Sequence, residues 1–338
     1  MMVHDNYHEI CAESYYELGY KIGSLFSEQC VDAVREYKTF YPASQKIKHS
    51  LDKCLEISQQ YFPCYIDELR GYADGAGVSI YDLWELNESD LFRSDLNRCT
   101  TVASAGGTLF AHNEDCDEDS FDYICILKKK IESLTVLELY YYNSSGGNAF
   151  SINSHGIIQA INTLHPRDIR TGIPRNIIAR WMSEADNPRA YFDRMVGLKR
   201  ASGFNHALLD VGGNIVNIET TAQKQHLTVP ELPFVHTNHY IGELKSYECS
   251  RFLKSSSARY NFANKRIGGQ MTVSEIRKLM CNTSKGKKNS IFNRSTIAGV
   301  IADLKKRSVY FWLLREQEKG WIRYDLDFLT PSALSDHM

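Results

Sequence analysis

The strongest constraint on the fold is a change of sequence pattern at Cys99. Before it, apolar residues recur at helical spacing from Ala12 to Tyr41 and again from Gln45 to Ala73, so the first 90 residues are predicted to be almost all helix. At Cys99 the run Cys-Thr-Thr-Val-Ala-Ser-Ala is followed by Gly106-Gly107 and Thr-Leu-Phe-Ala-His. Two short apolar runs around a glycine pair are typical of a hairpin. We therefore predict a hairpin that begins at the cysteine.

The remaining sequence alternates between strand blocks and helix blocks. Further strands are predicted over residues 123–131, 134–142, 149–153, 157–164, 206–211, 215–220, 296–304, 308–316 and 320–325. Helices are predicted over residues 174–185, 188–198, 256–265 and 273–280. This order indicates an α+β protein with mostly antiparallel sheets covered by helices, in one structural domain.

Composition narrows the class of partner. Lys plus Arg (39) nearly balances Asp plus Glu (41), which argues against a surface built for nucleic acid or anionic lipid and favours a small-molecule substrate. No run of eighteen apolar residues and no signal-peptide pattern is present, so we expect no membrane association and a cytoplasmic location. The nine cysteines form no CxxC pair, which predicts free thiols and no metal site.

A cysteine at the start of a strand has one route to activation that needs no separate base residue. If the peptide bond before it is cut, its own α-amino group, with a pKa of roughly 7.7–8.0, can accept the thiol proton. This route predicts a separable helical segment before the nucleophile, which the change at Cys99 provides. On the pattern alone, a buried strand cysteine remains the alternative.

Several motifs follow one another as they do in a known family. Cys99-Thr-Thr-Val is followed by Gly107-Thr-Leu-Phe-Ala-His-Asn-Glu-Asp115, then by Asn205-His-Ala-Leu-Leu-Asp-Val-Gly212, His236-Thr-Asn-His239 and Ser257-Ala-Arg259-Tyr260. This set resembles the acyl-coenzyme A:6-aminopenicillanic acid acyltransferase family (isopenicillin N acyltransferase-like, peptidase family C45), relatives of bile salt hydrolases and penicillin V acylases in the N-terminal-nucleophile hydrolase superfamily. The resemblance covers about residues 66–259.

The resemblance implies an αββα four-layer sandwich made as a self-cleaving precursor. The Arg98–Cys99 bond would be cut, giving a helical segment, residues 1–98, that stays bound to a catalytic segment, residues 99–338. No cofactor is implied, and a homo-oligomer is compatible with the family. Arg98 departs from the small residue that many relatives carry before the cysteine, and a bulky residue changes the backbone strain available for self-cleavage.

The resemblance also assigns site residues. Cys99 would be the nucleophile, and Asp115 would hold its new α-amino group. Asn238 would donate its side-chain N–H to the oxyanion, with a second donor from the backbone of Asn162, and Arg259 would favour the thiolate. The acidic residues beside Asp115, including Glu114, are assigned no role, and a solvated acidic loop is the alternative interpretation of Asp115 itself.

Three functional interpretations remain open. The favoured one is a self-processing cysteine amidohydrolase that cleaves a small N-acyl amine or N-acyl amino acid. The second is an acyltransferase that moves an acyl group from a thioester such as acyl-coenzyme A to an amine. The third is an uncleaved, inactive or binding-only homologue. A papain-like pairing of the cysteine with His112, His236 or His239 is less favoured, because structural roles explain these histidines better.

Overall fold

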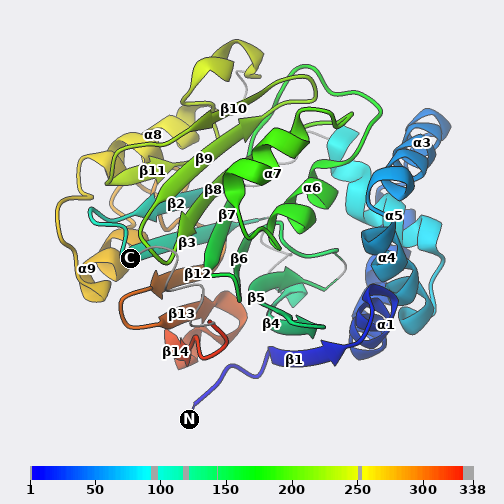
Figure 1. Cartoon of the computed structure of the whole chain (residues 1–338), viewed down its shortest axis with the longest axis horizontal. Helices are drawn as coiled ribbons and strands as arrows, with labels where there is room; N and C mark the ends of the chain where they lie inside the picture. The colour runs from blue at the N-terminus through cyan, green and yellow to red at the C-terminus, as the bar shows by residue number, and fades with distance from the viewer. Residues whose placement is uncertain (1, 93–97, 117–121, 143, 250–252, 330–338) are drawn as a thin grey trace.

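Two β-sheets stack face to face between two helical layers (Figure 1). The computed structural model describes residues 2–92, 98–116, 122–142, 144–249 and 253–329. In the first sheet the described strands follow the order β1 (Tyr7–Ala12), β4 (Ile124–Ile131), β5 (Leu134–Tyr141), β6 (Phe150–Asn153), β7 (Ile157–Thr163), β8 (Phe204–Asp210), β9 (Ile215–Thr220) and β10 (Gln225–Thr228). In the second they follow β11 (Phe234–His236), β2 (Arg98–Ala103), β3 (Leu109–Asp115), β12 (Thr296–Asp303), β13 (Ser308–Leu313) and β14 (Ile322–Asp325).

The core between the sheets is apolar because the strands alternate their side chains. Residues such as Phe110, Ile126, Phe150 and Val300 come from different strands and are all completely buried there. Successive residues of a strand point to opposite faces, so each sheet has a second face to cover. The helices cover it, which gives four layers.

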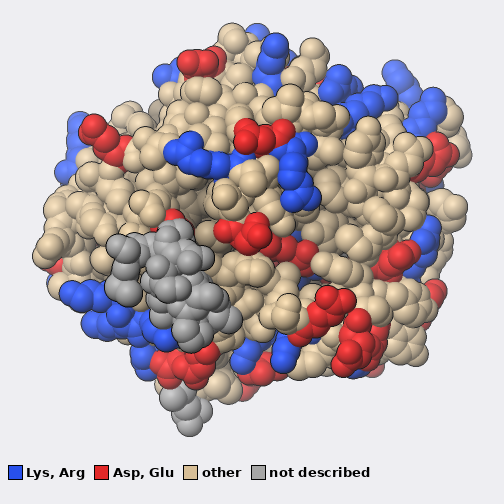
Figure 2. Space-filling view, in the orientation of Figure 1, with Lys and Arg blue, Asp and Glu red and all other residues tan. Residues whose placement is uncertain are grey.

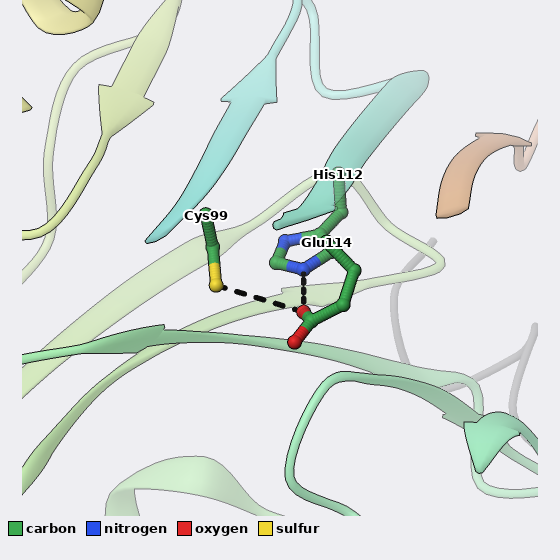
Figure 3. Close-up of side chains that lie close together, drawn as sticks. All are labelled: Cys99, His112 and Glu114. Atoms are coloured by element: carbon green, nitrogen blue, oxygen red, sulfur yellow. Dashed lines mark hydrogen bonds and ion pairs between the residues drawn. The ribbon is translucent and has the colours of Figure 1, made fainter. Parts of the chain in front are cut away.

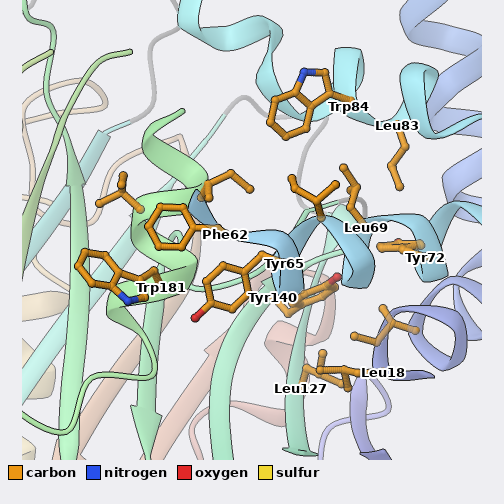
Figure 4. Packing of buried hydrophobic residues seen from close by; sticks show 14 of the residues in the cluster. Leu18, Phe62, Tyr65, Leu69, Tyr72, Leu83, Trp84, Leu127, Tyr140 and Trp181 are labelled. Carbon is orange, nitrogen blue, oxygen red and sulfur yellow. The ribbon is translucent and has the colours of Figure 1, made fainter. Parts of the chain in front are cut away.

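Within the described residues, seven helices cover the outer face of the first sheet: α1 (Tyr15–Leu25), α2 (Ser27–Phe40), α3 (Gln45–Tyr61), α4 (Pro63–Ala76), α5 (Ile80–Glu88), α6 (Arg175–Met182) and α7 (Pro188–Met195). Figure 4 shows part of this layer, where Leu18 and Tyr72 lie toward Leu127 and Tyr140 of the sheet and Trp84 packs further from it. The second sheet is covered by α8 (Leu253–Asn264) and α9 (Val273–Met280). The predicted αββα sandwich is therefore confirmed.

Helices α1 and α4 approach each other through glycines. A Cβ atom on Gly19 would lie 1.8 Å from the Glu68 carbonyl oxygen, and one on Gly71 would lie 2.0 Å from the Tyr16 carbonyl oxygen. No side chain fits such a gap, so the close approach of the two helices requires glycine at these positions. Gly19, one of the glycines that interrupt the first predicted helix, is thus needed for the packing of α1 against α4.

The prediction that the first 90 residues are almost all helix is wrong in two places. Residues 7–12 form strand β1, which pairs in parallel with β4 at the edge of the first sheet. The helix predicted from Ala12 to Tyr41 is divided at Phe26, whose buried ring stacks on Tyr142 with 4.4 Å between centroids. Contacts with distant strands, which the local pattern does not contain, decide both features.

Smaller differences occur near the ends of the sheets. Strands β10 and β11 were not predicted, and the strand predicted over residues 308–316 ends at Leu313, where a 3₁₀ turn begins. The remaining strands and helices agree with prediction to within a few residues. Positive and negative side chains are interspersed over the face seen in Figure 2. No helix of the described residues is long and apolar enough to cross a membrane.

Candidate active site

The hairpin of β2 and β3 places its side chains on two different faces. Its register pairs Cys99 with Glu114 and Thr101 with His112. Directly paired residues of an antiparallel ladder share a face, so these four side chains point the same way. That face looks toward the other sheet, since Thr101 Oγ1 donates to Asn162 Oδ1 of β7 across 3.1 Å.

The opposite face of the hairpin looks toward the helices. There Arg259 of α8, completely buried, donates from Nη1 to Thr100 Oγ1 across 2.7 Å. Asp115 pairs with Arg98 in the ladder and so belongs to this second face. The nucleophile predicted from sequence and its predicted aspartate therefore present their side chains to different layers of the sandwich.

Each polar group of Cys99 has a specific contact. Its backbone N–H donates to Asn238 Oδ1 across 2.9 Å, and its carbonyl oxygen accepts from Arg259 Nη1 across 2.6 Å. Its thiol sulfur lies 3.6 Å from Glu114 Oε2. Arg259 Nη2 also donates to Asn238 Oδ1 across 2.7 Å, which ties the two partners together. Residues from three distant parts of the sequence thus converge on one cysteine.

Glu114 lies at the centre of a buried hydrogen-bonded cluster (Figure 3). His112 Nε2 is 2.9 Å from Glu114 Oε2, the same oxygen that faces the Cys99 sulfur. The Tyr141 hydroxyl donates to the other oxygen, Oε1, across 2.7 Å. The far nitrogen of His112, Nδ1, is 3.0 Å from Thr101 Oγ1. Hydrogen bonds on both carboxylate oxygens fix the orientation of the group beside the thiol.

The intact chain keeps the Cys99 thiol protonated. Burial raises the pKa of this thiol well above its usual range, and the carboxylates of Glu114 and Asp115 raise it further. Arg259 and the backbone N–H of Asp115, which hydrogen-bonds to the sulfur, act in the opposite direction but do not outweigh burial. A thiol in this environment needs a proton acceptor before it can act as a nucleophile.

Asp115 is completely buried and fully hydrogen-bonded. Its two oxygens accept from Asn293 Nδ2 across 2.5 Å and from Thr296 Oγ1 across 2.6 Å. Burial raises the pKa of the Asp115 carboxyl from 3.8 to about 6, although Arg259 and the two hydrogen bonds hold it down. An ammonium formed beside this carboxylate would lower its pKa again, since opposite charges favour ionisation.

Asp115→Asn is expected to raise the free energy of unfolding at pH 7. Asp115 has a higher pKa in the folded state than in the unfolded chain, so its contribution to stability is most favourable below about pH 4 and is lost as pH rises through about 6. The difference between 3.8 and about 6 corresponds to about 3 kcal/mol. Urea unfolding of the uncleaved Cys99→Ala protein, with and without Asp115→Asn, measures it at several pH values, with the exposed Asp193→Asn as control. Equal stability of the two proteins from pH 4 to 7 contradicts the prediction.

Asn238 and Asn162 differ in their distance from the nucleophile. Asn238 contacts Cys99 directly, but through its carbonyl oxygen, while its Nδ2 group donates to the Thr163 carbonyl across 3.1 Å. Asn162 is buried on β7, one hydrogen bond further away through Thr101. In the described part of the chain its Nδ2 group has no hydrogen-bond partner. The structure therefore brings Asn238 and Arg259 to Cys99 and leaves Asn162 one residue removed.

His236 and His239, which a papain-like site would use, are hydrogen-bonded to residues other than the cysteine. His236 is buried against Glu219, with 3.1 Å between Nε2 and Oε1, and His239 is hydrogen-bonded to Ser256. Both histidines therefore have partners other than Cys99. The side chain of Arg98, whose bulk was noted above, lies outside the described residues, although its backbone opens strand β2.

A cavity of about 360 Å³ leads to the cluster. Glu114 and Tyr141 of the cluster line it, together with Thr163, Arg175, Phe204 and residues of α2. Its size lies in the range that small-molecule sites occupy. The thiol is buried, but a molecule in this cavity would lie next to the carboxylate that the thiol contacts.

Cys99, His112 and Glu114 have donor atoms within 4.8 Å of one another, as a metal site would. The distance between His112 Nε2 and Glu114 Oε2 is 2.9 Å, a normal hydrogen bond. Two such ligands on a tetrahedral zinc ion would be about 3.3 Å apart. We therefore interpret the group as a hydrogen-bonded cluster and assign it no metal.

The sequence predictions gave Glu114 no role, yet it is the carboxylate nearest the thiol among the described residues. The available signal was the alternation of the hairpin: once Cys99 pairs with residue 114, the two side chains must share a face. That pairing depends on the number of residues in the turn from Ser104 to Thr108, which the glycine pattern left undetermined.

The αββα layers, with a cysteine near the start of the inner strand β2, are the architecture expected for the N-terminal-nucleophile hydrolase fold. Residues 102–318 match the model of the acyl-coenzyme A:6-aminopenicillanic acid acyl-transferase family, which is more than half of the chain. The chain belongs to this family.

Relatives in this group include hydrolases and an acyltransferase. The β-alanyl-dopamine/carcinine hydrolase of Drosophila melanogaster is 23% identical over 88% of this chain and 89% of its own length. The 40 kDa form of acyl-coenzyme A:6-aminopenicillanic-acid-acyltransferase of Emericella nidulans is 25% identical over 58% of this chain and 59% of its own length. Among solved structures, penicillin V acylase from Agrobacterium tumefaciens matches with a TM-score of 0.44 and 11% identity, over 64% of this chain and 83% of that one.

Proposed function

We propose that this protein is a self-processing cysteine amidohydrolase that cleaves a small N-acyl amine or N-acyl amino acid through an acyl-Cys99 intermediate. The observation that carries the proposal is the convergence on Cys99: Asn238 holds its nitrogen, Arg259 its carbonyl oxygen, and a carboxylate faces its thiol. A buried strand cysteine with a purely structural role would not need a buried carboxylate beside its thiol. The family membership supports the same interpretation.

In the proposed turnover, cleavage of the Arg98–Cys99 bond turns the Cys99 amide nitrogen into an α-amino group. This amine takes the thiol proton, and the thiolate attacks the acyl carbonyl of the substrate. The proton then passes to the leaving amine as the C–N bond breaks, which leaves an acyl-cysteine thioester. Water then attacks the thioester, which releases the carboxylic acid and restores the thiol of Cys99.

Asp115 and Asn238 have complementary roles in this scheme. A carboxylate near the new α-amine would orient it, much as the third member of a catalytic triad orients its base. The Asn238 amide, next to the Cys99 nitrogen and to Thr163 at the cavity wall, would turn its N–H toward the oxyanion once the strand end is free. Such a donor typically contributes about 3–4 kcal/mol to the transition state.

Hydrolysis is favoured over transfer because the relative that aligns along most of the chain is named a hydrolase of β-alanyl-dopamine and carcinine. Acyl transfer is the second candidate, supported by the Emericella relative and by the family model. Both activities use the same acyl-cysteine and differ only in whether water or an amine resolves it. A binding-only homologue would show neither.

Residues 1–98 are further proposed to stay bound after cleavage, since β1 lies within the first sheet and Glu68 of α4 pairs with the buried Arg180 across 2.9 Å. A reducing, cytoplasmic location is proposed because all nine cysteines are free.

The test is incubation of the processed protein with a panel of N-acyl amines, N-acyl amino acids and acyl-thioesters, with and without a free amine acceptor. The proposal expects release of the carboxylic acid from an amide and an acyl adduct on Cys99 by mass spectrometry. Product formed only from thioesters and only with an amine would favour the acyltransferase. Cleaved protein that acts on no member of the panel and never carries an acyl adduct would count for the binding-only alternative.

A further inference from the structure

Self-cleavage requires a base that turnover does not. During turnover the free α-amino group of Cys99 can take the thiol proton, but before cleavage that nitrogen is part of the Arg98–Cys99 peptide bond. It donates its one hydrogen to Asn238 Oδ1 and has no basic lone pair to offer. The first reaction of the chain must therefore use a different proton acceptor.

One carboxylate among the described residues is positioned to do this. Glu114 Oε2 lies 3.6 Å from the Cys99 sulfur on the same face of the hairpin. Asp115 belongs to the opposite face, and its two oxygens already accept hydrogen bonds from Asn293 and Thr296. His112 is hydrogen-bonded to Glu114 and not to the thiol.

We propose that Glu114 is the general base of self-cleavage, a role that rests on the proposed function of Cys99 and ends once the α-amine exists. The Tyr141 hydroxyl occupies Oε1 and leaves Oε2 facing the sulfur. His112 Nε2 lies 2.9 Å from the same Oε2, and as an N–H donor it holds the carboxylate in place beside the thiol.

The proton of the Cys99 Sγ–H group passes to Glu114 Oε2, and the thiolate attacks the carbonyl carbon of Arg98. The tetrahedral intermediate collapses as the C–N bond breaks and the nitrogen of Cys99 takes a proton from Glu114, which gives a thioester and a free α-amine. Water then opens the thioester to the Arg98 carboxylate and restores the thiol. Burial, which raises the pKa of the thiol, makes the first transfer necessary.

The decisive experiment separates the two reactions. Full-length Glu114→Gln protein keeps the size of the side chain and one acceptor oxygen but cannot accept the proton. Its processing rate is measured by mass spectrometry after rapid synthesis. Turnover is measured on a protein made from two chains that are produced together: residues 1–98, and a second chain that begins Met-Cys99. Methionine aminopeptidase removes the methionine and so exposes the α-amine of Cys99. Glu28→Gln, the same change at an exposed position of α2, is the matched control.

We expect Glu114→Gln to slow processing by at least about 100-fold, the usual contribution of a general base, and to reduce turnover of the two-chain protein far less. Glu114→Ala should regain part of its processing rate when formate is added, since the cavity reaches position 114 and a small carboxylate can enter. Processing of Glu114→Gln within a few-fold of wild type overturns the proposal, and so does an equal loss of processing and turnover. Both outcomes leave the role of Cys99 standing, whereas processing of a Cys99→Ala protein would remove the proposed function itself.

Discussion

The Cys99→Ala protein is expected to remain a single chain of 338 residues and to hydrolyse no substrate. One sulfur atom is proposed to perform both self-cleavage and turnover, so its removal abolishes two reactions that otherwise have separate requirements. The substitution removes only a small side chain, and the backbone contacts of Cys99 with Asn238 and Arg259 do not involve the thiol. The fold should therefore persist while the chemistry is lost.

Intact mass and an amidase assay measure both effects, and Cys281→Ala, at an exposed cysteine, serves as the matched control. The control should process and turn over as the wild type does. Cleavage of Cys99→Ala protein between residues 98 and 99 would show that another group performs the cut. Loss of cleavage with full retention of hydrolysis would show that Cys99 is no nucleophile of turnover.

Arg259→Met is expected to damage both stability and processing. The guanidinium is completely buried and donates to the Cys99 carbonyl, to Thr100 Oγ1 and to Asn238 Oδ1. Methionine has a similar length but no donor, so these oxygens lose a charged partner, which costs about 3 kcal/mol. Displacement of Asn238 and of the strand end should slow processing by about 100-fold, the typical effect of a small misplacement in a catalytic site.

Lys254→Met, at an exposed position of the same helix, removes the same charge and is the control. Urea unfolding in the Cys99→Ala background gives the stability difference, and mass spectrometry of otherwise unchanged protein gives the processing rate. An Arg259→Met protein as stable as the control and processed at the same rate would mean that the arginine only fills space.

Features that depend on nearby residues were predictable from the sequence. The glycine pair after Ala103 identified the hairpin, and Pro63 marked the break between α3 and α4. Features set by distant partners were not predictable from local patterns. Strand β1 exists because it pairs with β4 more than a hundred residues later, and an edge strand of six residues carries little signal of its own.

The same distinction between local patterns and distant partners applies to the residues of the candidate site. The family motifs placed Cys99, Asn238 and Arg259 in one constellation, and the structure brings their atoms into contact. The motifs said nothing of the register that turns Glu114, and not Asp115, toward the thiol. In a strand, moving by one residue reverses the direction of a side chain, so adjacent acidic residues can have unrelated roles.

The pairing of strand β1 would affect how the protein refolds after the proposed cleavage. Because β1 pairs with β4 and helices α1 to α5 pack on the same sheet, the two segments that the proposed cleavage would produce contribute to one hydrophobic core. They could part only by unfolding, and neither holds all the residues needed to rebuild that core. A cleaved molecule that unfolds must find a second chain before it can fold again, so refolding would change from a reaction of one molecule to a reaction of two. The rate of folding would then be independent of protein concentration before cleavage and would depend on it after cleavage.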